Sequence, residues 1–162
     1  MANASTTGFG FRPIKMIGQA SNDAGLSEYK IAASSALISH GAMVQLTSDG
    51  VVLESANNTE ANLGVLNGIF FTDADTNKPT FANFSKASNT ATDIVAFVND
   101  DPRQMFEVMS ADTAFNQNEV GHCADQVKAD GVTPLFVSKS KISATTANSK
   151  AQLKILGVSR DP

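Results

Sequence analysis

The sequence contains few residues that could do chemistry, and the most reactive neighbours among them are His122 and Cys123. A cysteine nucleophile needs a base aimed at its sulfur, and usually a further group that orients this base. Adjacent residues of an extended strand point to opposite faces, so His122 is poorly placed to activate Cys123. The other histidine, His40, is remote in sequence. We therefore interpret Cys123 as a small apolar residue in or near the core.

Residues 73–77 begin like the loop of an EF-hand calcium site, because Asp73, Asp75 and Asn77 alternate along the chain. Such a loop continues with Gly at its sixth position and Glu at its twelfth. This chain has Lys78 and Phe84 at those positions. Two histidines and one cysteine are also too few for a zinc site without carboxylates, and they show no ligand spacing. The sequence thus predicts a polar surface loop and no metal ion.

The acids Asp100, Asp101 and Glu107 could be imagined as a general acid–base pair. Paired acids in a turn are far more often turn formers that face water, since Asp bonds back to its own turn backbone. The glycines of Gly8-Phe9-Gly10 follow no predicted strand and open no predicted helix, so they indicate no nucleotide-binding loop. We therefore expect a protein that is not an enzyme, with no catalytic residues and no cofactor.

The composition limits the class of partner. The chain has 162 residues, which is the size of one domain, and only 17% of them are charged, against about 25% in typical proteins. The net charge is −4 and the Lys and Arg residues are scattered, so a nucleic-acid partner is not expected. A single cysteine excludes an internal disulfide framework. We see neither a secretory signal nor an apolar run near the ~20 residues of a membrane span, and expect synthesis and use in a reducing compartment.

The strongest local pattern is the stretch 92–110, which predicts a β-hairpin. Apolar residues occupy both faces of each arm, which indicates central strands. The segment 99–103 between the arms, with its Asn, two Asp and Pro, predicts the chain reversal. A second hairpin is predicted for 43–47 and 51–54, around Asp49-Gly50.

Other segments predict further strands and loops. The run 63–72 predicts a strand with a bulge or bend near Gly68, and 28–33 predicts an extended segment. Short strands are expected at 15–19, 36–39, 135–137 and 152–158, and a helical turn at 111–115. The stretch 122–129 fits a short strand or a helix equally well. We expect 73–93 to be a long surface loop anchored by Phe81 and Phe84.

No window predicts an amphipathic helix of ten or more residues, so the fold class is all-β. We expect a compact β-barrel or β-sandwich with long loops, in which residues 1–14 form an extended N-terminal arm and 15–162 a single β-rich domain. Phe9 and Phe11 lie on this otherwise polar arm. They must be buried somewhere, either against the chain's own core or on a neighbouring subunit.

Four short stretches, spread over most of the chain, carry a further signal. They are 8–13 (GFGFRP), 25–31 (GLSEYKI), 100–102 (DDP) followed by 104–108 (QMFEV), and 153–162 (LKILGVSRDP). Together they resemble a family of small head proteins of tailed bacteriophages, the decoration or cement proteins that bind the outer capsid.

This resemblance implies a viral structural protein that clamps the shell and does no catalysis. It implies the phage major capsid protein as partner, assembly as a homotrimer, a place on the capsid surface of the virion, and synthesis in the cytoplasm of the bacterial host. Three weak contacts of a closed trimer would act together through a high effective concentration. We expect the contact surface to include Phe9, Phe11, Arg12 and Ile14, and deletion of residues 1–13 to leave the domain folded but unable to bind.

Two other classes remain open. One is a different virion component, such as a tail, fibre or shell protein, although a major shell protein is usually longer and richer in helix. The other is a glycan- or ligand-binding β-module. Such modules commonly use exposed aromatic residues, and here the Phe-rich segment with Phe81 and Phe84 could serve.

Overall fold

The computed structural model describes residues 7–18, 25–56, 61–111, 115–143 and 151–159. Within these ranges the chain is built from short antiparallel strands, and the one helical element is the 3₁₀ turn η1 (Gln117–Glu119). The all-β fold class is therefore confirmed.

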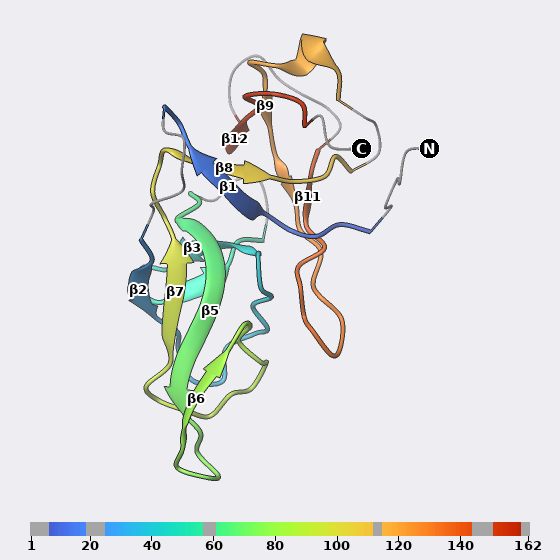
Figure 1. The fold of residues 1–162 in the computed structure, drawn as a ribbon. Coiled ribbons are helices and arrows are strands. Elements are labelled where there is room, and N and C mark those ends of the chain that lie inside the picture. Colours follow the sequence, from blue (N-terminus) through green and yellow to red (C-terminus); the bar gives the residue numbers. More distant parts are fainter. Residues whose placement is uncertain (1–6, 19–24, 57–60, 112–114, 144–150, 160–162) are drawn as a thin grey trace.

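The larger part of the molecule is a six-stranded sheet, which we call the body (Figure 1). Its strands run in the order β2-β7-β5-β3-β4, and β6 pairs with the C-terminal end of β5. The strands are β2 (Ser27–Lys30), β3 (Met43–Leu46), β4 (Val52–Glu54), β5 (Gly64–Thr72), β6 (Pro79–Ala82) and β7 (Val95–Asn99).

The remaining strands form three two-stranded sheets in the upper part of Figure 1, which we call the lobe. β1 (Arg12–Met16) pairs with β8 (Gln104–Glu107), and β9 (Cys123–Ala124) pairs with β12 (Leu153–Lys154). β10 (Gln126–Val127) pairs with β11 (Lys141–Ile142). The lobe thus unites the N-terminal segment with the C-terminal third of the chain.

Two sequence predictions about the body are confirmed. β3 and β4 form the hairpin around Asp49-Gly50, with Leu46 opposite Val52. β5 covers nearly the whole predicted run, and its register with β7 shifts between Leu66 and Gly68, which leaves Asn67 as the bulged residue. In both cases the prediction rested on a local turn or glycine, which does not depend on contacts between distant segments.

The predicted hairpin over 92–110 is wrong, although the chain does reverse there. The Asp101 carbonyl accepts a 2.9 Å hydrogen bond from the Gln104 N–H, and Asp101 Oδ1 accepts one of 2.7 Å from the Arg103 N–H. The two arms, however, belong to different sheets. β7 has β2 on one edge and β5 on the other, so no edge remains for β8, which pairs with β1 instead.

Several other predicted elements are corrected. The loop expected over 73–93 contains β6, in which Phe81 lies opposite Phe70 of β5. The stretches 36–39 and 135–137 contribute only isolated bridges, Ile38 to Ser85 and His40 to Val137. The final strand shortens to β12, the undecided stretch 122–129 becomes β9 and β10, and the helical turn forms at η1 instead of at 111–115, of which residues 112–114 lie outside the described ranges.

The body sheet is open. β2 and β4 are its edge strands, and they form no ladder with each other, although an isolated bridge links Lys30 to Val51. The described residues therefore form no closed barrel.

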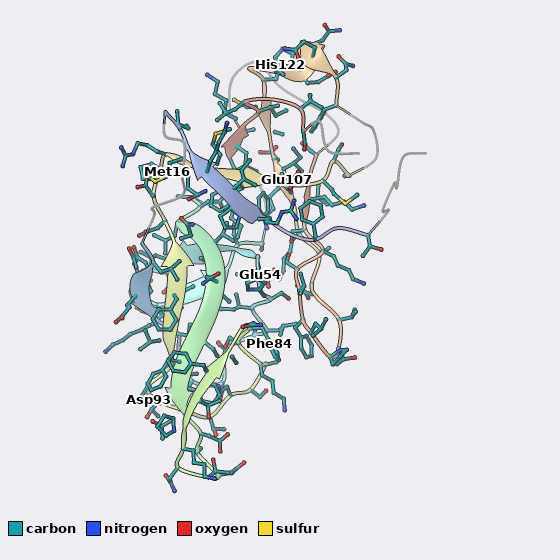
Figure 2. The ribbon with its side chains drawn as sticks, viewed as in Figure 1. Met16, Glu54, Phe84, Asp93, Glu107 and His122 are labelled. Carbon is teal, nitrogen blue, oxygen red and sulfur yellow. The ribbon has the colours of Figure 1, made fainter. Side chains whose placement is uncertain are left out.

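The buried apolar residues form two clusters. The body core is aliphatic: Ile31, Ile38, Ala42, Val44, Val52, Leu66, Ile69, Ala91, Ile94, Ala96 and Val98. The lobe core contains Phe11, Met43, Val65, Ala124, Ile142 and Ile155. Figure 2 shows Glu54 near the junction of these two parts and Asp93 toward the far end of the body.

The N-terminal segment is packed against the chain from Gly8 onward, while residues 1–6 lie outside the described ranges. The side chain of Phe11 is 2% exposed and belongs to the lobe core. Of the two locations expected for the aromatic residues, the structure thus places Phe11 in the chain's own core. Deletion of residues 1–13 would remove this core side chain, which argues against the expectation that such a deletion leaves the domain folded.

Candidate functional site

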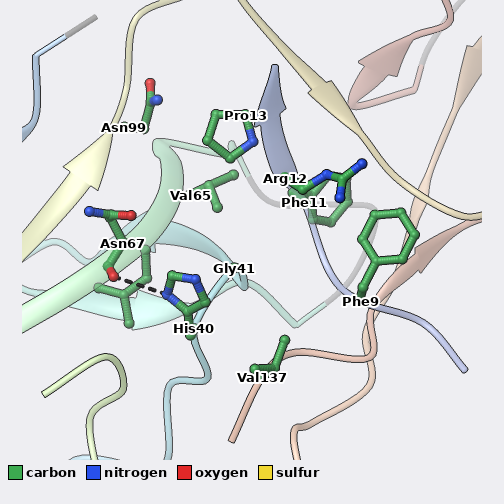
Figure 3. A pocket seen from close by; sticks show the side chains of 11 residues that line it. Phe9, Phe11, Arg12, Pro13, His40, Gly41, Val65, Asn67, Asn99 and Val137 are labelled. Atoms are coloured by element: carbon green, nitrogen blue, oxygen red, sulfur yellow. Dashed lines mark hydrogen bonds between the residues drawn. The ribbon is translucent and has the colours of Figure 1, made fainter. Parts of the chain in front are cut away.

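Three of the four predicted interface residues meet at one cavity. Phe9, Phe11 and Arg12 line a space of about 330 Å³ between the start of β1 and the bulge of β5 (Figure 3). The other lining residues are Pro13, His40, Gly41, Val65, Leu66, Asn67, Asn99 and Val137. The walls are mainly apolar, and a few polar side chains converge on the space.

Two glycines allow the N-terminal segment to reach this position. Gly10 has a φ of +74°, and a Cβ on it would lie 2.6 Å from the Gly41 carbonyl oxygen. A Cβ on Gly8 would lie 2.2 Å from the Lys139 carbonyl oxygen. The Phe11 N–H then donates a 2.9 Å hydrogen bond to the Gly41 carbonyl. The glycines of Gly8-Phe9-Gly10 therefore serve close backbone approach, which is a main use of glycine.

His40 is held at the opposite wall of the cavity. Its backbone N–H donates to the Phe136 carbonyl at 3.0 Å, and its carbonyl accepts from the Ser138 N–H at 2.8 Å. Its ring Nδ1 lies 3.0 Å from the carbonyl oxygen of Asn67, the bulged residue of β5 (Figure 3). A carbonyl oxygen can only accept, so Nδ1 carries the hydrogen, and in the neutral ring Nε2 is the acceptor.

Arg12 closes the cavity on the N-terminal side, and its charge is compensated. Its guanidinium pairs with the carboxylate of Glu107, the residue directly opposite it in β8, and lies 5.5 Å from the centre of the Phe9 ring. The hydroxyl of Ser159 donates to Glu107 at 2.9 Å. The hydrogen bond from Ser159, together with Arg12, lowers the pKa of Glu107 below its ordinary value. The cavity therefore has no strong net charge of its own.

Ile14, the fourth predicted residue, lies apart from the cavity. The register of β1 with β8 shifts between Pro13 and Lys15, so Ile14 is the extra residue of a bulge. Its side chain is 45% exposed, and that of Ile17, just beyond β1, is 49% exposed. The predicted set is thus divided between a cavity and an adjoining apolar surface.

The acids singled out in the sequence have structural partners. Asp73 Oδ1 accepts from the Asp75 N–H and from both the backbone and the hydroxyl of Thr76, and the Thr76 bonds lower the pKa of Asp73. Asp100 accepts from the hydroxyls of Ser27 and Tyr29, at 2.8 and 2.6 Å. The turn at 73–77 therefore orders its own backbone, and across the part of the chain that the structure describes no three His, Cys, Asp or Glu side chains gather as metal ligands.

His122 lies at the lobe end of the molecule (Figure 2), and neither it nor Cys123 lines the cavity. Cys123 opens β9 opposite Lys154, is half-buried and forms no disulfide. Its position agrees with a residue near the core.

Most parts of the site that depend on long-range contacts could not be predicted from the sequence. Asn67 is an exception, because it precedes Gly68, near which the sequence predicted a bulge. His40 and Val137 had no such signal, because the bridge between them and the hydrogen bond from Phe11 to Gly41 join segments that are distant in sequence.

Comparison with protein-family models, with curated protein sequences and with solved structures found no match to this chain. Over the described ranges, no helix is long and apolar enough to cross a membrane.

Proposed function

We propose that this chain is a decoration subunit of a phage head. As a homotrimer, it binds the major capsid protein on the outer surface of the shell and stabilises the shell. Two things support this proposal: the four stretches that resemble the decoration proteins, and the apolar surface beside β1. Ile14 and Ile17 are each nearly half exposed, and Leu26 is also exposed. Exposed apolar side chains of this kind can mark a surface that a partner covers.

The N-terminal segment is suited to binding because it is already in place. Phe11 is buried, β1 pairs with β8, and the Ile17 N–H donates a 2.8 Å hydrogen bond to the Arg103 carbonyl. A partner that docks on Ile14 and Ile17 therefore does not have to order this part of the chain, and that ordering is a cost of association.

Point substitutions test this proposal better than deletion of the segment. The variant Ile14→Ser with Ile17→Ser removes exposed apolar surface without touching the core. We expect it to fold normally and to sediment with undecorated phage shells at least tenfold less well than the original chain. Its matched control is Leu46→Ser with Val127→Ser, two similarly exposed residues elsewhere. Light scattering on the free protein measures whether it is a trimer. Equal shell binding by both double variants contradicts the proposal.

One observation favours a second candidate function, a glycan- or ligand-binding module. Phe81 is 74% exposed on the outer face of the body sheet, and its ring centre lies 4.9 Å from that of Phe70 and 6.3 Å from that of Phe97. Phe84, expected to act beside it, packs elsewhere against Phe136 at 4.4 Å. Under this alternative, Phe81→Ala abolishes binding on a glycan panel, whereas Leu135→Ala, an equally exposed control, does not.

A further inference from the structure

We propose that the cavity beside His40 receives the side chain of a tyrosine from the surface that this protein covers. The inference rests on the proposed function, because it takes the occupant to belong to a shell protein. The size of the cavity, the chemistry of its walls and one hydrogen-bond acceptor carry the argument.

The size of the cavity limits the occupant. Ligand pockets usually measure about 300–1,000 Å³, and this one, at about 330 Å³, is at the lower end of that range. It therefore suits one ring and not a nucleotide or an oligosaccharide.

The walls favour an aromatic ring. Phe9, Phe11 and Pro13 line one side, and Val65 and Val137 add aliphatic surface. Aromatic pairs are stabilised by more than the burial of their area. The Arg12 guanidinium, which already lies over Phe9, is at the same wall and can face a second ring.

The ring should carry a hydrogen-bond donor. The Asn67 carbonyl fixes the hydrogen of His40 on Nδ1, so Nε2 presents a lone pair, and none of the described residues donates to it. A phenol hydroxyl supplies such a donor at the end of a single ring. Phenylalanine has a ring but no donor, serine and threonine have a donor but no ring, and tryptophan has its donor on a larger system of two fused rings. Tyrosine therefore meets both requirements with a single ring.

The wall is also preformed. Backbone hydrogen bonds on both sides of His40, at 3.0 and 2.8 Å, hold it whether or not the cavity is filled. An occupant therefore meets an acceptor that is already oriented, and binding orders little of the protein.

The first test compares p-cresol, which copies the tyrosine side chain, with toluene, which lacks only the hydroxyl. Titrations of the full chain are followed by NMR at the amides of Gly41 and Asn67. We expect p-cresol to bind about fivefold more tightly than toluene, the effect of one neutral hydrogen bond of about 1 kcal/mol. Equal affinities, or no shift of these amides with either compound, overturn the proposal.

Two variants test whether the difference in affinity between p-cresol and toluene arises at His40 in this cavity. His40→Phe keeps a ring and removes the acceptor, so p-cresol should lose its advantage while toluene binds within twofold as before. Toluene binding also shows that this variant is folded. Val137→Phe adds bulk at a partly exposed wall residue and should weaken both compounds. An unchanged preference for p-cresol in His40→Phe contradicts the role of Nε2.

A competition experiment distinguishes the occupant from the function itself. Saturating p-cresol should reduce co-sedimentation of the protein with shells, and toluene at equal occupancy should do the same. Undiminished shell binding with a filled cavity refutes tyrosine as the occupant and leaves the decoration function intact. If the protein does not bind shells at all, the proposed function fails, and the assignment of a shell tyrosine fails with it.

Discussion

The body packs its sheet on eleven buried aliphatic residues, whereas the lobe gathers six buried residues of mixed type within the described ranges. Two of those six, Met43 and Val65, come from β3 and β5 of the body. The strands differ in the same direction. Body strands have three to nine residues, while four of the six lobe strands have only two.

In the lobe, serine hydroxyl groups help to hold the chain in place by accepting hydrogen bonds from backbone N–H groups. The Ser140 Oγ accepts a 3.0 Å hydrogen bond from the Ala129 N–H, and the Ser143 Oγ accepts one of 3.1 Å from the Asp125 N–H. Such bonds satisfy backbone groups that a ladder of two residues leaves over. The comparison indicates that the body depends mainly on burial, whereas the lobe adds individual polar contacts to a smaller apolar core.

The largest test of this comparison uses one substitution in both cores. Ile69→Ala in the body should cost about 3–5 kcal/mol of unfolding free energy, because this side chain is 1% exposed and belongs to the larger core. Ile155→Ala in the lobe should cost about 2 kcal/mol, since fewer apolar neighbours surround it and the site can collapse. Urea denaturation measures both. Equal losses would mean that the lobe core is as tightly packed as that of the body.

The next largest effect on stability is expected at Glu54, where the body and the lobe meet. Glu54, at the end of β4, is 8% exposed, and neither carboxylate oxygen has a hydrogen-bond partner among the described residues. The nearest cation, Lys128 Nζ, lies 3.7 Å away and is also 3.4 Å from Asp130. Burial raises the pKa of Glu54 from 4.5 to about 7, against the opposing attraction of Lys128.

The raised pKa makes stability depend on pH. Between about pH 4.5 and pH 7 the folded chain holds a proton on Glu54 that the unfolded chain has lost, so unfolding free energy falls as the pH rises. The fall amounts to at most about 3 kcal/mol, at 1.36 kcal/mol per unit of pKa. Glu54→Gln should remove this slope and be more stable than the original chain at pH 8.

Urea denaturation at pH 5 and at pH 8 checks the prediction, with Glu28→Gln as an exposed control that keeps the slope. Asp73 and Glu107, whose pKa values are lowered from ordinary values of 3.8 and 4.5, titrate below this window and do not obscure it. A slope that persists in Glu54→Gln would assign the pH dependence to another group.

The same contrast explains what the sequence could predict. The bulge in β5 and the hairpin of β3 with β4 follow from Gly68 and Asp49-Gly50, which act locally. Alternation in β7 and β8 shows which faces are apolar but not which strand is the partner, so the pairing of β8 with β1 could not be foreseen.

The candidate site divides in the same way. Phe9 and Phe11 could be found because aromatic residues on a polar segment need burial, and Arg12 is next to them in the chain. His40 is brought to them by the bulge at Asn67, the bridge to Val137 and the hydrogen bond from Phe11 to Gly41. These contacts join distant segments and leave no periodic signature in the sequence.

The smallest predicted effect on stability comes from replacing serine with alanine at two fully buried positions, one in each part of the molecule. Ser140→Ala in the lobe leaves the Ala129 N–H without its acceptor and should cost about 1–2 kcal/mol. Ser85→Ala in the body removes a hydroxyl that has no partner among the described residues, so stability should stay the same or rise slightly. Thermal or urea unfolding measures the difference, and hydrogen exchange of the Ala129 amide reports the lobe directly. If both serines cost the same, hydroxyl bonds do not hold the lobe, and its stability comes from burial as in the body.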